Sequence, residues 1–519
     1  MARSQTQFDA AAWSSGICSL WRNTLNQSCV LFFMILIDIL PLNSSLIAQD
    51  SSQSVPPLYR ELLRPQFHFT ATADYINDPN GLFYLDGIYH LFFQTGPITA
   101  KRWGHAISTD MLHWRQLDDA ILPHEGHPVF SGCAVVDHNN TAGFAKSDAA
   151  HPPIVAIFTS WGVGQCLAYS LDSGKAWQRY DGNPVQTDPQ DKLRSFPLTS
   201  RDPHVMWDPK HNRWVMVLYD NLNDHFIPNV HRHRQGGLSI FTSPDLKKWR
   251  RESHLAGFYV CPDVFELPIE DEDATSWVAL DWSQYVVGSF DGTTFTPRTR
   301  PRPLDFGTKG TLSANQSWKH LPDGRVVQIS WIRGGEYPGM PFDQQLSIPV
   351  ELRLRRIEGN LRLCKTPIRE LESLWKPVRG HHTAASPLDG NGTRKRELPL
   401  DIDSGKSFDV ALKTEFSSDT ERLAMMVLGH TIELSRDTIR LGEHQMAADQ
   451  PIRDVRLLAD VTSIELFIND GSQSLTFTVN PTGNATQFSL RISAGSPQVT
   501  SLLIHKVDSV WDTQNGKTD

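Results

Sequence analysis

Asp78 and Asp202 are the acidic residues whose setting could support chemistry. Asp78 lies in Asn77-Asp78-Pro79-Asn80-Gly81, between apolar or aromatic runs. Pro79 favours an extended Asp78, and Asn80-Gly81 is a strong turn pair, so Asp78 is predicted at a strand end that begins a hairpin. A lone turn of this kind usually holds an aspartate that only caps the hairpin. Likewise, Arg201-Asp202-Pro203 taken alone is most simply a surface ion pair before a strand.

The residues after Asp78 change this interpretation. Gly87 to Gln94 is a second apolar strand, Arg102-Trp103-Gly104-His105-Ala106 follows it, and Ser108 to Trp114 comes next. This succession resembles the opening of glycoside hydrolase family 32, the β-fructofuranosidases, which include invertases, inulinases and levanases. The resemblance implies that Asp78 is the nucleophile and that the family's Arg-Asp-Pro motif is matched at Arg201. Asp202 is then the transition-state stabiliser, with Arg201 as its oriented partner.

The third motif of the family, Glu-Cys-Pro-Asp, is altered in this chain. The matching text is Val260-Cys261-Pro262-Asp263, so valine stands where the family has its general acid and base. Retaining cleavage of a glycoside needs a carboxylate and a carboxylic acid about 5 to 5.5 Å apart. Valine cannot donate a proton, and loss of a general acid typically costs on the order of 10²- to 10⁴-fold in rate.

Three explanations of this substitution remain open. Another acid could serve, and the candidates are Glu336, in a segment that by resemblance reaches the pocket, and Glu266, which lies about 20 Å along an extended strand unless the chain turns at Pro262. Alternatively, the substrate could have a leaving group that needs little protonation, or the pocket could perform a different reaction. Finally, the protein could bind sugars without turnover.

Further pocket residues follow from the resemblance. They are expected to contact substrate and are Asn77, Gln94, Trp103, Ser131, Arg201 and Asp263. Trp103 is equally well interpreted as a core residue of the fold. Thr95-Gly96-Pro97 replaces the family's usual Tyr-Asn-Pro, which predicts a reshaped rim.

Composition sets broad limits. A chain of 519 residues, 39% hydrophobic and 21% charged, is long enough for two soluble domains. A net charge of −9 argues against nucleic acid as a partner, and the 15 tryptophans suit a carbohydrate ligand. The cysteines after residue 50 lack metal-ligand spacing, so we expect neither a metal site nor a cofactor.

The N-terminal 50 residues are predicted to be a signal peptide or hydrophobic leader. Cys29 to Ile37 is an apolar run of h-region length, too short to span a bilayer comfortably. Secretion is therefore expected, and a membrane anchor formed by residues 29–47 is the alternative. Asn-X-Ser/Thr sequons at Asn139, Asn315, Asn391 and Asn484 are compatible with a secreted glycoprotein.

The rest of the chain is predicted to be all-β. Short apolar runs alternate with turns, and a unit of strand, Ser-X-Asp turn and aromatic residue recurs at Ser108, Ser170, Ser243 and Ser289. Such repeats indicate the blades of a β-propeller, and the resemblance implies five blades. We expect the propeller over 60–375, a hinge over 376–397, a C-terminal β-sandwich over 398–508 and a polar tail over 509–519.

The function expected from these features is hydrolysis of β-fructofuranosides, of the sucrose, inulin or levan type, by a retaining mechanism, with fructosyl transfer as a variant. The alternative is a catalytically impaired sucrose- or fructan-binding homologue, because the general acid is Val260. Release of arabinose from an arabinan would indicate a third class, a propeller hydrolase of another furanoside.

Overall fold

The computed structural model describes residues 59–187, 200–221, 236–307, 311–377, 398–401, 406–482 and 487–511. Apart from the 3-10 helices η1 (Ile98–Ala100) and η4 (Arg369–Leu374), the regular structure in these ranges consists of β-strands. The predicted leader, and residues 378–397 of the predicted hinge, lie outside the described residues. The described ranges contain no helix with the length and apolar character that a membrane span requires.

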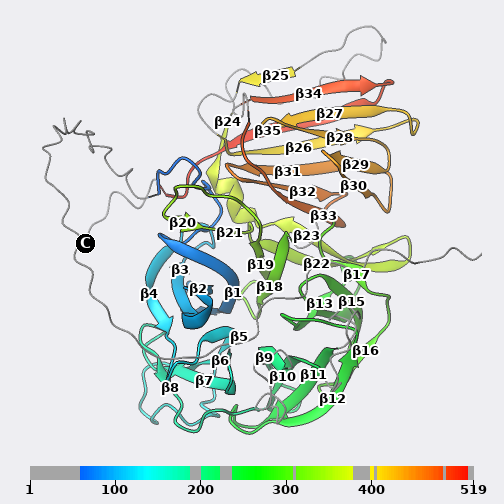
Figure 1. The fold of residues 1–519 in the computed structure, drawn as a ribbon. Helices are drawn as coiled ribbons and strands as arrows, with labels where there is room; N and C mark the ends of the chain where they lie inside the picture. Colours follow the sequence, from blue (N-terminus) through cyan, green and yellow to red (C-terminus); the bar gives the residue numbers. More distant parts are fainter. Residues whose placement is uncertain are drawn as a thin grey trace, which may run out of the picture. The chain divides into compact units, whose positions relative to one another are not determined.

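Residues 74–367 form five antiparallel sheets, drawn from blue to yellow-green in Figure 1. The first two blades contain β1 (Asp74–Leu85), β2 (Ile88–Thr95), β3 (Arg102–Ser108) and β4 (Arg115–Ile121), then β5 (Val129–Val136), β6 (Ile154–Ser160), β7 (Gly164–Ser170) and β8 (Gln178–Arg179). The third contains β9 (Ser200–Asp208), β10 (Arg213–Asp220), β11 (Gly237–Ser243) and β12 (Arg250–Ala256). The predicted five-bladed propeller is therefore present.

The last two blades each carry one additional short strand. The fourth contains β13 (Asp263–Pro268), β14 (Thr275–Leu280), β15 (Gln284–Phe290), β16 (Phe295–Pro297) and β17 (Arg302–Pro303). The fifth contains β18 (Leu312–Trp318), β19 (Val326–Ile332), β21 (Gln345–Leu346), β22 (Val350–Ile357) and β23 (Asn360–Pro367). The strand β20 (Phe342–Asp343) pairs in parallel with β1 and so ties the fifth blade to the first.

The first strands of the blades lie next to one another. The strand β1 contacts β5 and β18, β5 contacts β9, and β13 contacts β18. Residues at corresponding positions of different blades therefore come together, although they are far apart in the sequence.

The recurring Ser-X-Asp unit forms the turn between the third and fourth strands of a blade. In the first blade, Asp110 accepts hydrogen bonds from the backbone N–H groups of Leu112 and His113, and Trp114 Nε1 donates to the Met111 carbonyl. Asp172 and Trp177 of the second blade, and Asp245 and Trp249 of the third, repeat these contacts. The aspartate accepts hydrogen bonds from turn amides, which explains why the unit recurs at the same turn of these blades.

The C-terminal strands form two packed six-stranded sheets, which confirms the predicted sandwich. One contains β24 (Trp375–Pro377), β35 (Gln498–Val507), β26 (Phe408–Glu415), β31 (Asp454–Asp460), β32 (Ser463–Ile468) and β33 (Gln473–Thr478). The other contains β25 (Leu398–Asp401), β34 (Gln487–Ala494), β27 (Arg422–Val427), β28 (His430–Leu434), β29 (Thr438–Leu441) and β30 (His444–Ala447).

The ends of the sandwich differ from the predicted boundaries. Trp375 to Pro377 pair with His505 to Val507, so the sandwich includes a strand that lies before Leu398. The predicted polar tail begins with structured residues, because Trp511 is 2% exposed and its ring stacks on Tyr59 with centroids 4.3 Å apart. The indole of Trp511 also donates to the Pro65 carbonyl. The polar composition of the last residues gave no indication that Trp511 is buried.

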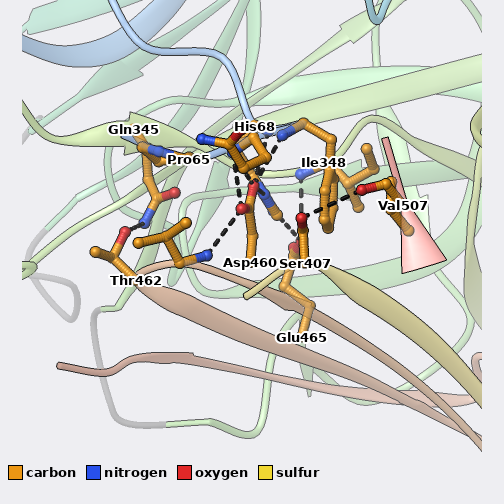
Figure 2. Close-up of polar contacts among 12 residues, drawn as sticks. Pro65, His68, Gln345, Ile348, Ser407, Asp460, Thr462, Glu465 and Val507 are labelled. Carbon is orange, nitrogen blue, oxygen red and sulfur yellow. Dashed lines mark hydrogen bonds and ion pairs between the residues drawn. The ribbon is translucent and has the colours of Figure 1, made fainter. Parts of the chain in front are cut away.

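A buried histidine joins the sandwich to the segment that enters the propeller (Figure 2). His68 Nδ1 lies 2.8 Å from Asp460 Oδ2, and His68 Nε2 lies 2.7 Å from Glu465 Oε2. Asp460 also accepts the backbone N–H groups of Gln66, Phe67 and His68. Burial would lower the pKa of His68, but the hydrogen bonds to both carboxylates outweigh it and raise the pKa to about 9. The imidazole is therefore charged at neutral pH.

We expect this contact to make stability depend on pH above neutrality. The pKa of His68 is raised above its unfolded value near 6.5, so its contribution is complete below pH 6.5 and is lost as the pH rises through about 9. Replacement of His68 by alanine leaves two buried carboxylates without their cationic partner and should cost about 3–5 kcal/mol at pH 6.5. Urea unfolding of the native chain and of the variant at pH 6.5 and 9.5 measures both effects.

The control is His124→Ala, because the side chain of His124 is exposed. The expected result is that the difference between native and His68→Ala narrows at pH 9.5, whereas His124→Ala follows the native chain throughout. Equal pH profiles for native and His68→Ala would contradict a charged imidazole at this contact.

Candidate active site

A cavity of about 380 Å³ collects residues from all five blades. Its lining residues are Asn77, Asp78, Gln94, Phe130, Ser131, Arg201, Asp202, Tyr259, Val260, Cys261, Trp282, Ser313, Ala314, Trp331 and Arg333. Two aspartates predicted from separate motifs, Asp78 and Asp202, therefore face one space.

β-Bulges at the same level of four blades bring these residues to the cavity. Asn77 and Asp78 of β1 stand opposite Gln94 alone, and the register of β5 shifts in the same way at Phe130 and Ser131. The strands β9 and β18 shift at Asp202 and at Ala314. A bulge inserts an extra residue and re-aims its side chain. Each of these four innermost strands thus directs a side chain into the cavity that regular alternation would direct elsewhere.

Two of the bulge residues adopt a backbone conformation that is uncommon for residues other than glycine. Asp202 has φ 60° and Ala314 has φ 53°, both in the left-handed region. Next to the bulge of β5, a side chain at Gly132 is excluded, because a Cβ there would lie 2.0 Å from the Ile157 carbonyl oxygen. The backbone at the cavity is therefore held in place by its neighbours.

Asp78 is oriented through both carboxylate oxygens. Asn77 Nδ2 donates to Asp78 Oδ1 at 3.2 Å, and Ser131 Oγ donates to Asp78 Oδ2 at 2.5 Å. Gln94 links the two donors, because its Oε1 accepts from Asn77 and its Nε2 donates to Ser131. Asp78 is only half-buried, so one face of the carboxylate remains open to the cavity.

A buried lysine holds the Asn77 side chain that donates to Asp78. Lys101 Nζ donates to Asn77 Oδ1 at 2.7 Å and lies 4.7 Å from the centre of the Tyr75 ring. Burial lowers the pKa of Lys101 to about 8, while the charge of Asp78 opposes that shift. The ammonium is thus placed to fix the Asn77 amide, which in turn donates to Asp78.

Asp202 is held in a more enclosed position. Its backbone N–H donates to Thr159 Oγ1 at 3.0 Å, and its Oδ2 accepts the backbone N–H of Cys261 at 3.1 Å. Arg201 Nε lies 3.5 Å from the same oxygen. Burial raises the pKa of Asp202; the charge of Arg201 opposes that shift and the charge of Asp78 adds to it. The two carboxylates therefore interact electrostatically across the cavity.

Val260 presents an apolar side chain at the cavity wall. It is 8% exposed and packs with Tyr219, Cys261 and Ala314, beside the partly buried Tyr259 and Trp282. Among the described residues, Asp78 and Asp202 are the only carboxylates that line the cavity.

Both candidate substitute acids lie elsewhere. Glu266 is exposed on β13, accepts a hydrogen bond from Thr275 Oγ1 and lines a different cavity. Cys261 has φ 55°, so the chain changes direction before β13 begins, and strand alternation does not carry over from Val260 to Glu266. Glu336 is exposed in the segment after β19 and does not line the cavity, although Arg333 of the same segment does.

Two of the predicted substrate contacts are also corrected. Trp103 is fully buried among Phe92 and Phe158, and its Nε1 donates to the Phe130 carbonyl at 3.0 Å. It therefore supports the bulge of β5 as a core residue. Asp263 is fully buried, where it pairs with Lys319 and lies 3.4 Å from His204 Nε2, so it does not line the cavity.

The cavity residues that the sequence did not indicate are Tyr259, Trp282, Ser313 and Ala314, whereas Trp331 and Arg333 lie in the segment that the resemblance placed at the pocket. Tyr259 directly precedes the altered motif at Val260, which was an available signal. Trp282 has no local signal, because a tryptophan next to a strand is as often a core residue.

Known proteins resemble this chain over nearly its whole described length. Family models for the glycosyl hydrolases family 32 N-terminal domain and the glycosyl hydrolases family 32 C terminal match residues 68–367 and 370–506. The levanase of Bacillus subtilis is 32% identical over 511 residues, covering 88% of this chain and 72% of the relative. An extracellular exo-inulinase of Aspergillus niger is 28% identical over 537 residues, covering 88% and 96%.

Solved structures agree with these matches. The exo-inulinase from Aspergillus awamori matches with a TM-score of 0.75 at 26% identity, covering 87% of this chain and 100% of that one. The fructofuranosidase from Schwanniomyces occidentalis complexed with fructose matches with a TM-score of 0.70 at 26% identity, covering 88% and 100%.

Replacement of Asn80 by alanine should loosen the bulges of β1 and β5 together. Asn80 is fully buried; its Nδ2 donates to the Asp78 carbonyl at 2.9 Å and its Oδ1 accepts the backbone N–H of Gly132 at 3.0 Å. The variant removes one hydrogen bond from each of these two backbone groups, so the free energy of unfolding should fall by about 1–3 kcal/mol. Urea unfolding measures the loss, and Asn139→Ala is the control because Asn139 is exposed. Equal destabilisation by both variants would contradict this account.

Proposed function

The chain belongs to glycosyl hydrolase family 32, and on that premise we propose that it cleaves β-fructofuranosides of the sucrose, inulin or levan type through a covalent fructosyl-enzyme on Asp78. The observation that carries this proposal is the orientation of Asp78. Both of its oxygens accept side-chain hydrogen bonds, and the carboxylate still faces the cavity. A retaining glycosidase needs its nucleophile fixed in this way.

Asp202 serves as the transition-state stabiliser. It is buried, faces the same cavity as Asp78 and is held by Cys261 and Arg201. A carboxylate in that position accepts hydrogen bonds from sugar hydroxyls and balances the positive charge that develops on the ring. Asn77, Gln94, Ser131 and Arg201 complete the polar wall that would contact the fructosyl unit.

The step that lacks a residue is proton delivery to the leaving oxygen. Val260 occupies the position of the family's acid, and no other described carboxyl lines the cavity in its place. Hydrolysis of an ordinary glycoside is consequently slow, by a factor on the order of 10² to 10⁴ relative to a chain that has the acid.

The expected partner is a sugar substrate encountered outside the cell. Extracellular exo-inulinases are among the relatives, which supports secretion of this chain. A cleaved leader within residues 1–50 would provide the route.

The apolar side chain of Val260 at the cavity wall also favours a second function. A pocket with Asp78 and Asp202 but with valine at position 260 can bind the fructosyl unit of a sugar without cleaving its glycosidic bond. In that case the protein is a sucrose- or fructan-binding homologue, and affinity rather than turnover is its property.

Fructose release from sucrose, inulin and levan tests these functions. The native chain should act slowly, Val260→Glu should gain about 10²- to 10⁴-fold, and Asp78→Ala should abolish release in both backgrounds. The control is Val260→Gln, which has nearly the shape of glutamate but cannot act as a carboxylic acid, and it should gain nothing.

Detectable binding without any release by the native chain would replace the hydrolase with the binding function. Activity that survives Asp78→Ala would contradict the nucleophile itself.

A further inference from the structure

The charged groups of the cavity are unusual for the cleavage of an ordinary glycoside. Among the described residues, the lining contains the carboxylates of Asp78 and Asp202 and the guanidinium groups of Arg201 and Arg333. At position 260 it contains an isopropyl group. The cavity thus holds a nucleophile, a charge stabiliser and two cations, but no carboxylic acid to protonate an alkoxide.

The two arginines differ in how they are engaged. Arg201 lies within 3.5 Å of the buried Asp202 and serves that carboxylate. Arg333 is exposed; its backbone N–H donates to the Thr311 carbonyl at 2.7 Å, and its guanidinium lies 5.6 Å from the centre of the Trp331 ring. A guanidinium held on an aromatic face at a cavity wall is suited to bind an oxyanion through paired hydrogen bonds.

Loss of the acid affects both halves of a double displacement. The residue that protonates the leaving oxygen in the first half normally deprotonates water in the second. Val260 can do neither. An oxyanion needs neither step, because it leaves without a proton and attacks without losing one.

Building on the proposed function, we propose that this chain transfers β-fructofuranosyl groups between oxyanions of the phosphate or carboxylate class, with Arg333 binding the oxyanion at the cavity. The fructosyl unit occupies the wall formed by Asp78 and Asp202. The departing and arriving oxyanions occupy the part of the cavity that Arg333 lines.

The two steps balance without a proton donor. In the first, an oxygen of Asp78 forms a bond to the anomeric carbon, and the bond from that carbon to the leaving oxygen breaks with its electron pair on the oxyanion. In the second, the acceptor oxyanion forms a bond to the anomeric carbon, and the bond to Asp78 breaks to regenerate the carboxylate.

A donor with a stable leaving anion tests the first step. The native chain is given p-nitrophenyl β-D-fructofuranoside, and p-nitrophenolate release is compared with glucose release from sucrose as kcat/KM. We expect the nitrophenyl donor to be at least about 100-fold faster. Val260→Glu should reduce that ratio by a similar factor, because it restores protonation of the sugar leaving group.

Added anions test the second step and distinguish the two sources of oxyanion. Inorganic phosphate and acetate are added separately, and the fructosyl phosphate or fructosyl acetate formed is identified by mass spectrometry. Acceleration by one anion alone identifies the class used. Arg333→Gln should reduce the acceleration about 10-fold or more, since it removes a charge-assisted contact, whereas the exposed control Arg300→Gln should leave it unchanged.

Each contrary result overturns the inference, and the results differ in what they imply for the proposed function. Equal rates on sucrose and the nitrophenyl donor would show that an acid is present, and the hydrolase assignment would stand. Failure of the native chain on the nitrophenyl donor, with activity of Val260→Glu on sucrose, would also leave that assignment intact. If neither chain released p-nitrophenolate or fructose, both proposals would fall.

Discussion

The site depends on a register constraint that is repeated around the propeller. In β1, β5, β9 and β18 two residues stand opposite one at the level of the cavity. Regular alternation would send every second side chain into the body of a blade, whereas the bulges turn Asp78, Ser131 and Asp202 toward a common space. The cost is a strained backbone, visible in the positive φ of Asp202. Asn80 and Thr159 offset that cost, since they hydrogen-bond to the backbone beside or within the bulges.

The fold could be predicted from the sequence because its signals are local. The Ser-X-Asp turn and its aromatic residue form a unit only a few residues long, such as Asp110 to Trp114, so the sequence alone reveals the blades that contain it. The number of blades came from the resemblance, because the fifth blade turns through Glu358-Gly359 without that unit. The sandwich boundary was displaced because β24 pairs with a strand over a hundred residues later, which no local pattern reveals.

The candidate site was predictable where a motif and a bulge coincide. Asp78, Asp202 and Ser131 line the cavity, and all three lie in motifs that matched the family. Trp103 and Asp263 matched the family as well, yet both are fully buried behind the cavity wall. A sequence match gives the position of a residue in the chain but does not show whether its side chain is buried or faces the cavity. Glu266 does not line the cavity even though the chain turns at Cys261, because its side chain is exposed on β13 and lines a different cavity.

Position 260 separates the geometry of the pocket from its chemistry. The backbone there is fixed by its neighbour, because the Cys261 N–H donates to Asp202, and this bond does not depend on the side chain at 260. Valine adds an apolar contact to Tyr219 and Ala314, so the wall closes without a carboxyl. Asp78 and Asp202 therefore keep their hydrogen bonds although no carboxyl stands at position 260. In the transfer that we propose, such a pocket selects groups that leave and arrive as oxyanions, and the exposed guanidinium of Arg333 supplies the positive charge that they require.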